Sequence, residues 1–152
     1  MNPEHDPMGF GYQMTQALLA LGSGGLFGVG LGQSRQKFNY LPEPVTDSIF
    51  AVLGEELGLI GTVTVVALFL FIAWRGLRIA AAAPDESGRL LAIGIVSWIV
   101  FQAFINISAI TGLIPLTGIP LPFISYGGTS LAVLLAAVGI LLNISKHSTL
   151  KS

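Results

Sequence analysis

The sequence predicts an all-α membrane protein with three transmembrane helices and a glycine-rich N-terminal segment. Only 10% of the residues are charged and 53% are hydrophobic, which is far from the balance of soluble proteins. Two long runs, residues 57–74 and 90–145, carry no charge at all. A membrane-spanning helix needs about 20 apolar residues. The first run therefore fits one helix, whereas the second is long enough to hold more than one.

The second run divides at residues 113–122, which read LIPLTGIPLP. Three prolines and a glycine cannot continue a helix there, because each proline lacks a backbone N–H and clashes with the preceding turn. A short polar link, AAAPDESGR, contains the helix-stopping Pro84 and separates the two runs. We therefore predict a three-helix transmembrane region over residues 49–152, with helices near 49–79, 90–112 and 123–145 and a C-terminal tail.

Residues 1–48 are predicted to lie outside these three helices. Within them, residues 9–32, GFGYQMTQALLALGSGGLFGVGLG, begin as an amphipathic stretch and end with six glycines between residues 22 and 32. Such a segment suits a partly helical element that lies in the membrane interface or re-enters the bilayer. A nucleotide-binding loop is excluded, because the glycines do not read G-x-G-x-x-G and no P-loop lysine and serine follow them.

The basic residues predict the orientation of the chain, since cytoplasmic loops of membrane proteins are enriched in Lys and Arg. Five of the seven basic residues flank the first link or follow the last helix: Arg75, Arg78, Arg89, Lys146 and Lys151. We therefore expect the link and the C-terminus to be cytoplasmic, and residues 1–48 and 113–122 to face outward. Arg35 and Lys37 lie in the outward segment and count against this orientation.

Composition also excludes several kinds of site. The chain has no cysteine, which rules out disulfides, iron–sulfur clusters and zinc–thiolate sites. His5 and His147 stand isolated at opposite ends, so no metal site is predicted from histidine spacing. The net charge is −1 and there is no large basic block, so nothing indicates a nucleic-acid partner.

Residues 40–58, YLPEPVTDSIFAVLGEELG, carry the candidate chemistry. They place Asp47 between a proline-containing polar loop and the start of a long hydrophobic helix. A carboxylate at a low-dielectric boundary is costly to desolvate, so its presence indicates a site for chemistry on a membrane-embedded substrate. Taken alone, the residues favour a second interpretation, in which Asp47 caps the N-terminus of the following helix. One carboxylate can do both.

Four stretches resemble the SEDS family (shape, elongation, division and sporulation), the polytopic membrane proteins that include FtsW, RodA and SpoVE. They are residues 11–32, residues 36–61, the helix ending in WRGLR, and QAFINISAITGLIPLTGIPLPFISYGGTSL at residues 102–131. Together they cover nearly the whole chain in family order, and the QK…YLPE wording leans toward the FtsW branch. The resemblance implies the carboxy-terminal part of a larger helical bundle.

The same resemblance implies a peptidoglycan glycosyltransferase that polymerises lipid II at the outer face of the bacterial cytoplasmic membrane, in cell division or cell-shape control. It also implies a class B penicillin-binding transpeptidase as partner. Asp47 matches the family's aspartate and is assigned as the general base that activates the attacking sugar hydroxyl. Two departures from the family pattern flank it, since Val45 replaces a histidine and Ser48 an aromatic residue. The amino-terminal half, with basic residues for the substrate pyrophosphate, is expected to be missing.

Five further residues are predicted to bind substrate, namely Lys37, Glu43, Gln102, Asn106 and Tyr126. Each has a structural alternative. Lys37 is equally well explained as a surface charge, and Glu43 as a solvated loop carboxylate. Gln102 and Asn106 lie one helical turn apart, which also suits interhelical hydrogen bonding, and Tyr126 suits an interfacial anchor. Cofactor use stays open, because a divalent cation could serve the pyrophosphate in place of Lys37.

Two other functions stay open. One is a lipid II flippase, and the other is a non-catalytic membrane scaffold for the transpeptidase. Transport predicts charged residues along a path at mid-membrane, whereas residues 90–145 carry none. The acidic site lies in the outward segment instead, which favours chemistry on an exported substrate. Apart from lipid II and the transpeptidase, the predicted partners are the membrane lipids themselves.

Overall fold

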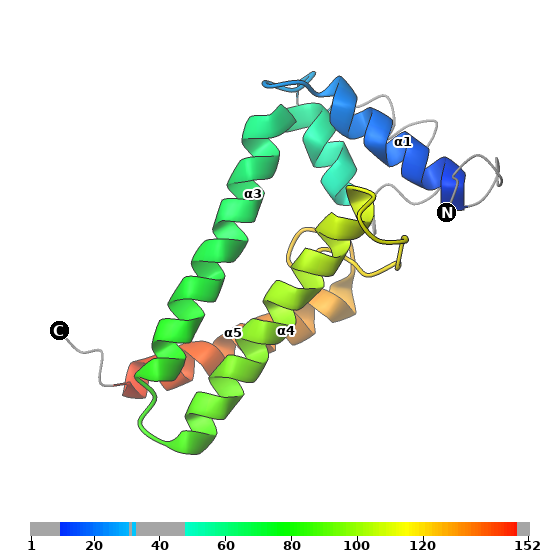
Figure 1. Cartoon of the computed structure of the whole chain (residues 1–152). Helices are drawn as coiled ribbons and strands as arrows, with labels where there is room; N and C mark the ends of the chain where they lie inside the picture. The colour runs from blue at the N-terminus through cyan, green and yellow to red at the C-terminus, as the bar shows by residue number, and fades with distance from the viewer. Residues whose placement is uncertain (1–9, 31, 33–47, 149–152) are drawn as a thin grey trace.

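The computed structural model describes residues 10–30, 32 and 48–148. Four helices lie in these ranges, α1 (Phe10–Ser23), α3 (Ile49–Ala81), α4 (Glu86–Ile110) and α5 (Gly128–His147), and no strand occurs in them (Figure 1). The three longer helices are long and apolar enough to cross a membrane. The prediction of an all-α, multi-pass membrane fold with a partly helical N-terminal segment is therefore confirmed.

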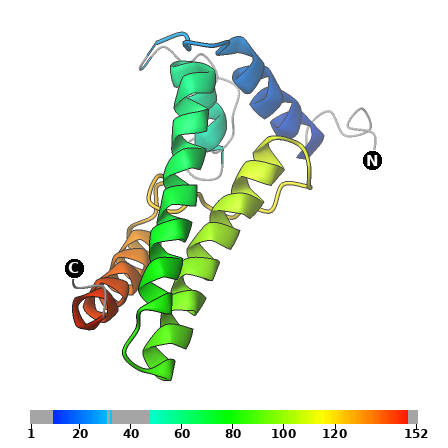
Figure 2. The same cartoon turned by 60° about the vertical axis from the view of Figure 1, so that its left-hand side comes forward.

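Helices α3 and α4 run antiparallel and form the largest helix–helix contact (Figures 1 and 2). Buried residues recur three or four positions apart on each helix, which places them on one face. On α3 they include Phe69, Gly76, Ile79 and Ala80, and on α4 Ala92, Ile95, Val96, Ile99 and Ala103. A methyl group of Val96 fills the space where a side chain at Gly76 would begin. Small residues at such contacts let helix backbones approach closely.

Helix α5 joins this pair through one buried face. Leu134 and Ala137 belong to the same core cluster as Phe69 and Ile99, so α5 contacts both longer helices. Further along, Leu141 packs with residues near the α3–α4 turn. The apolar core therefore continues along the bundle from its upper end in Figure 1 to the turn between α3 and α4.

The ends of α4 and α5 differ from those predicted, for local reasons. Helix α4 begins at Glu86 instead of residue 90, because Asp85 is its N-cap and accepts a hydrogen bond from the Gly88 N–H at 2.9 Å. Helix α5 begins at Gly128 instead of residue 123. The backbone of Phe123 has a φ of 66°, which no helix allows, so residues 121–125 form a turn before the helix.

Helix α1 covers the upper end of the bundle in Figure 1. Its buried residues Ala17 and Ala20 join the core cluster that also holds Phe50 from α3 and Ile110 from α4. The Met14 and Leu18 side chains lie beside Gly112, just after the end of α4. Helix α1 therefore packs against both the start of α3 and the end of α4, and it is part of the fold rather than an appendage.

The described cations gather at the other end of the bundle. Arg75, Arg78 and Arg89 lie near the α3–α4 turn, and Lys146 lies in the last turn of α5, which reaches the same end (Figures 1 and 2). The Arg78 guanidinium stacks over the Trp74 ring at 5.1 Å from its centroid. The bundle therefore has one basic end, within the described residues, and this clustering is what the positive-inside prediction required.

Replacing Gly76 with Leu should force α3 and α4 apart, because the new side chain would overlap Val96. Overpacking a close contact typically costs about 1–3 kcal/mol. Gly94→Leu on α4 is the matched control, since no atom of the described part of the chain lies within 4 Å of the position its Cβ would take. We expect thermal unfolding in detergent, measured on a full-length protein carrying this segment, to shift downward for Gly76→Leu only. Equal melting temperatures for the two variants would contradict this packing.

Candidate functional site

Helix α3 is broken at Gly58, whose φ of 67° and ψ of −160° are not helical. The break divides it into a short arm, residues 49–57, and a long arm, residues 59–81. The short arm turns back beside α1 instead of continuing the axis of the long arm (Figures 1 and 2). The single helix predicted from residue 49 therefore has a break, which falls directly after the sequence GEEL at residues 54–57. The long arm alone matches the length of a membrane crossing.

The segment of residues 24–30, called here the glycine loop, inserts its backbone into this break. In a continuous helix the N–H groups of Leu59 and Ile60 would bond to the carbonyls of Glu55 and Glu56. Here they donate instead to the carbonyls of Gly25 (2.9 Å) and Leu26 (3.4 Å). The Glu55 and Glu56 carbonyls accept from the N–H groups of Val29 (2.9 Å) and Gly30 (3.2 Å). Four backbone bonds thus replace the two that the break removes.

Glycine is required at this insertion because the backbones touch. A Cβ on Gly24 would overlap the carbonyl of Gly54, and a Cβ on Gly28 would overlap the carbonyl of Glu56. A Cβ on Gly58 would overlap the Gly28 nitrogen, and its φ also lies in the region that glycine adopts most readily. Gly24, Gly28 and Gly58 therefore serve close backbone approach within the fold.

A second irregular segment, residues 113–127, is called here the proline loop. Its backbone folds back from the end of α4 and lies alongside that helix. Asn106 Nδ2 donates to the Ile119 carbonyl at 2.7 Å, and Gln102 Nε2 donates to the Pro120 carbonyl at 2.9 Å. Gln102 precedes the last residue of α4, Ile110, by two turns, which corresponds to about 12 Å along the axis. The proline loop thus re-enters the bundle.

Non-helical backbone at membrane depth must satisfy its polar groups within the protein. Prolines reduce the demand, because Pro115, Pro120 and Pro122 have no N–H to satisfy. The Leu121 N–H donates to Ser125 Oγ at 2.7 Å, so this hydroxyl takes a role that sequence reasoning did not assign to it. Ser125 follows Leu121 by four residues, and at such short spacings a Ser hydroxyl can form a hydrogen bond with the backbone. This spacing was the indication of its role in the sequence.

The first turn of α3 meets the proline loop at the end of α4. Phe50 and Ala51 are buried in one cluster with Ile110, Leu121 and α1 residues. Ser48 is the N-cap residue of α3, with no side-chain cap bond, and the helix begins at Ile49. The N-cap position that the sequence suggested for Asp47 is therefore taken by Ser48. This junction, where α1, α3, α4 and the proline loop come together, is the candidate functional site.

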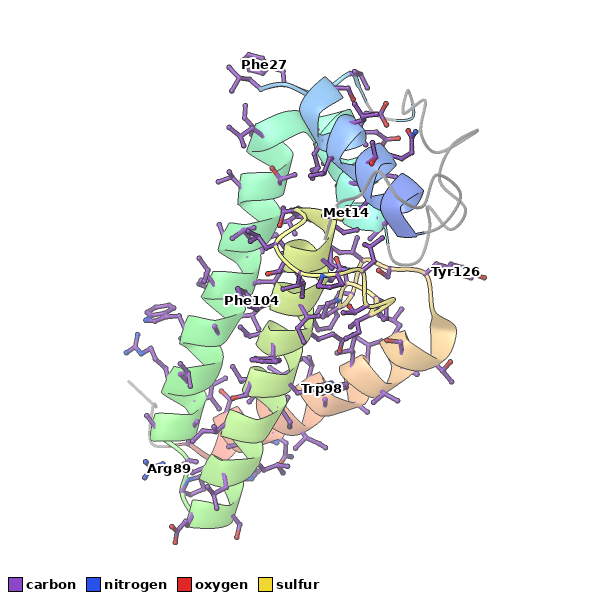
Figure 3. The ribbon with its side chains drawn as sticks, turned by 45° about the vertical axis from the view of Figure 1, so that its right-hand side comes forward. Met14, Phe27, Arg89, Trp98, Phe104 and Tyr126 are labelled. Atoms are coloured by element: carbon purple, nitrogen blue, oxygen red, sulfur yellow. The ribbon has the colours of Figure 1, made fainter. Side chains whose placement is uncertain are left out.

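The predicted site residues are only partly placed. Gln102 and Asn106 lie on α4 at this junction, where both hold the proline loop. Tyr126 is 78% exposed and its side chain points away from the helices (Figure 3). The remaining three, Asp47, Lys37 and Glu43, lie outside the described residues. Substrate contact by any of the six stays a prediction.

Two acidic residues accompany the break in α3. Glu55 is 4% exposed and therefore buried, and Glu56 Oε1 is buried with no hydrogen-bond partner in the described part of the chain. Neither was among the predicted site residues, although two adjacent glutamates inside an apolar helix are an unusual signal. In the ranges that the structure describes, His, Cys, Asp and Glu side chains form no group of three that could hold a metal ion.

Known proteins match this chain over nearly its whole length. The sequence profile of the FtsW/RodA/SpoVE family, described as "Cell cycle protein", matches residues 1–150. Stage V sporulation protein E of Bacillus subtilis is 60% identical over 97% of this chain and 40% of its own length. A probable peptidoglycan glycosyltransferase FtsW of Geobacter metallireducens is 54% identical over 95% of this chain and 39% of its own length. The chain thus spans about 40% of the length of these relatives.

Two solved structures share the fold. A chain of a peptidoglycan synthase complex, studied for its coordination of polymerization and crosslinking, superposes with a TM-score of 0.78. It is 29% identical, and the match covers 99% of this chain and 40% of that one. The rod-shape-determining protein RodA of Thermus thermophilus superposes with a TM-score of 0.66 at 34% identity, over 88% of this chain and 40% of its own.

Replacing Asn106 with Leu tests its place in the fold. Removing the amide leaves the Ile119 carbonyl without its donor, and an unsatisfied buried group costs about 1–3 kcal/mol. We therefore expect a lower melting temperature for this variant of a full-length protein in detergent. Asn143→Leu, at an exposed position of α5, is the control and should leave the melting temperature nearly unchanged. An unchanged melting temperature for Asn106→Leu would instead favour the substrate contact predicted from the sequence.

Proposed function

Because this chain belongs to the FtsW/RodA/SpoVE family of cell cycle proteins, we propose that it is the carboxy-terminal part of a lipid II polymerase of the bacterial cytoplasmic membrane. The observation that carries the proposal is the match of nearly the whole chain to relatives named as probable peptidoglycan glycosyltransferases. The activity belongs to the complete protein, since this chain corresponds to less than half of those relatives.

The reaction joins two sugars and releases a lipid pyrophosphate. A hydroxyl of the acceptor sugar attacks the anomeric carbon of the donor, and the bond from that carbon to the pyrophosphate oxygen breaks. The hydroxyl proton must leave as the new glycosidic bond forms. A sugar hydroxyl is a weak nucleophile at neutral pH, so a positioned carboxylate that accepts this proton lowers the barrier. We assign this role to Asp47.

The fold supports this assignment through the start of α3. Asp47 is joined directly to Ser48, and the first turn of α3 is held by the buried Phe50 and Ala51. A base needs a fixed position relative to its substrate, and a packed helix start provides one for the residue before it. Glu43 and Lys37 are assigned to the sugar and the pyrophosphate, and Gln102, Asn106 and Tyr126 to the polar part of the substrate beside the proline loop.

We further assign the basic end of the bundle to the cytoplasm, so that residues 1–48 and the proline loop face outward. The long apolar faces of the helices then contact membrane lipids and the lipid tail of the substrate. The structural neighbour from a peptidoglycan synthase complex supports a class B penicillin-binding transpeptidase as partner.

Asp47→Asn should abolish polymerisation in a full-length protein that carries this segment. The substitution preserves size but removes the proton acceptor, and general base catalysis is worth about 10²–10⁴-fold. The N-cap residue Ser48 is unchanged, so the variant should still reach the membrane. Polymer formation from purified lipid II is the measurement.

Glu43→Gln is the control for this experiment and should reduce the rate less, because its assigned role is supportive. Near-normal polymerisation by Asp47→Asn, at matched membrane abundance, would show that Asp47 is not the general base. A wild-type protein that moves lipid II between leaflets without forming polymer would favour the flippase.

The orientation has its own test. Single cysteines are placed at Ser34 and Ser87 in a full-length protein without other cysteines, and intact cells are treated with a membrane-impermeant thiol reagent. Ser87 lies in the first turn of α4 beside the basic α3–α4 turn, so we expect protection there and labelling at Ser34. Labelling at Ser87 with protection at Ser34 would reverse the orientation.

A further inference from the structure

The short arm of α3 is attached to the long arm by one non-helical residue, Gly58, and by the glycine loop. No continuous helix fixes the angle between the arms, because Gly58 interrupts the ladder of helical bonds. Four backbone bonds from the glycine loop to Glu55, Glu56, Leu59 and Ile60 hold the arms at this angle, together with the packing of Phe50 and Ala51 in the core. Two of these bonds go to each arm, so the glycine loop joins both sides of the break.

We propose that Gly24, Gly28 and Gly58 form a backbone clamp that sets the angle of the short arm and with it the position of Ser48, the residue that follows the proposed base Asp47 in the sequence. The clamp rests on the proposed function, because it gives these glycines a positioning role for the base. They are positioning residues and do not contact the substrate. They act on the reaction indirectly, because they set the position of the short arm, and Asp47 directly precedes its N-cap residue, Ser48.

The geometry makes the reaction sensitive to this angle. The short arm of residues 49–57 is about 13 Å long. A rotation of about 10° at Gly58 would therefore move its start by on the order of 2 Å, from the same helix rise. A misplacement of about 1 Å between reacting groups can cost on the order of 100-fold in rate. A small change at the clamp is thus enough to disable a base that remains chemically intact.

The chain offers a matched pair of variants. Gly28 and Gly32 have nearly the same φ, 78° and 79°, so replacing either with Ala introduces the same backbone strain. They differ in their surroundings. A Cβ on Gly28 would overlap the carbonyl of Glu56, whereas none of the described residues comes within 4 Å of a Cβ on Gly32. Gly28→Ala therefore disturbs the clamp, and Gly32→Ala controls for the strain.

Two measurements on a full-length protein test the proposal. The first is the distance between spin labels on single cysteines at Ser48 and Ser87, read by pulsed electron resonance, which reports the angle between the arms without requiring activity. The second is lipid II polymerisation by the unlabelled variants, with kcat and KM separated. For Gly28→Ala we expect a shifted or broadened distance and a kcat lowered by about tenfold or more, with KM within about twofold. Gly32→Ala should match the wild type in both.

Each other outcome is decisive. An unchanged label distance in Gly28→Ala would overturn the clamp. A changed distance with wild-type kcat would overturn its positioning role. A kcat and KM that change together in Gly28→Ala and Gly32→Ala would indicate strain alone and would also overturn it. If the wild type itself forms no polymer, the proposed function fails, while the label distances still decide whether the clamp sets the angle.

A second pair covers the case in which Gly28→Ala does not reach the membrane. A Cβ on Gly24 would overlap the Gly54 carbonyl, whereas no described residue lies within 4 Å of a Cβ on Gly22, which makes none of the clamp bonds. Gly24→Ala and Gly22→Ala should repeat the contrast in distance and kcat. If both Gly28→Ala and Gly24→Ala fail to accumulate while both controls do, the glycine loop is required for folding and a role confined to positioning is overturned.

Discussion

The need to satisfy backbone polar groups within an apolar bundle governs this structure. Water is scarce at membrane depth, so every N–H and C=O that leaves a helix needs a partner from the protein. In the described residues, the break at Gly58 and the proline loop are the places where non-helical backbone lies inside the bundle. At Gly58 the partners are backbone groups of residues 25–30, and in the proline loop they are the side chains of Gln102, Asn106 and Ser125. The packing of α1, the start of α3 and the start of α5 all depend on these bonds.

The glycine loop and the proline loop both have to satisfy backbone polar groups outside a helix, but they use different residue types. Backbone-to-backbone bonding requires close approach, which only glycine permits where Gly24 and Gly28 lie against the short arm. Side-chain bonding allows a wider separation, and there proline is favoured because it removes donors and limits the conformations of the unfolded chain. The composition of each loop therefore follows from which kind of partner it uses. It also explains why one chain concentrates its glycines and prolines in separate stretches.

The apolar runs predicted the three membrane helices, since length and charge decide what can cross a bilayer. Their ends were less predictable. The positive φ of Phe123, which precedes the later start of α5 at Gly128, was not predicted. The break at Gly58 was not predicted either, although Gly54, Glu55 and Glu56 precede it, because the contact that stabilises it comes from residues 25–30, far away in the sequence. Asn106 and Gln102 were recognised as a polar pair one turn apart, but their bonds to residues 119 and 120 depend on a re-entrant loop that no local pattern shows. The placement of Asp47, Glu43 and Lys37 lies outside the described residues.

The distribution of charge determines what this chain can and cannot contribute to the proposed reaction. A departing pyrophosphate needs cations or oriented donors close to it. In the described ranges, Arg75, Arg78, Arg89 and Lys146 all lie at the basic end, and Figure 3 shows Arg89 at the end of the bundle opposite Phe27. Exposed charges are screened beyond about 10 Å, so these side chains cannot act at the candidate site near the end of α4. The described helices can therefore hold a base in place, whereas the positive charge for the leaving group has to come from Arg35, Lys37, a bound cation or further residues of the longer family protein.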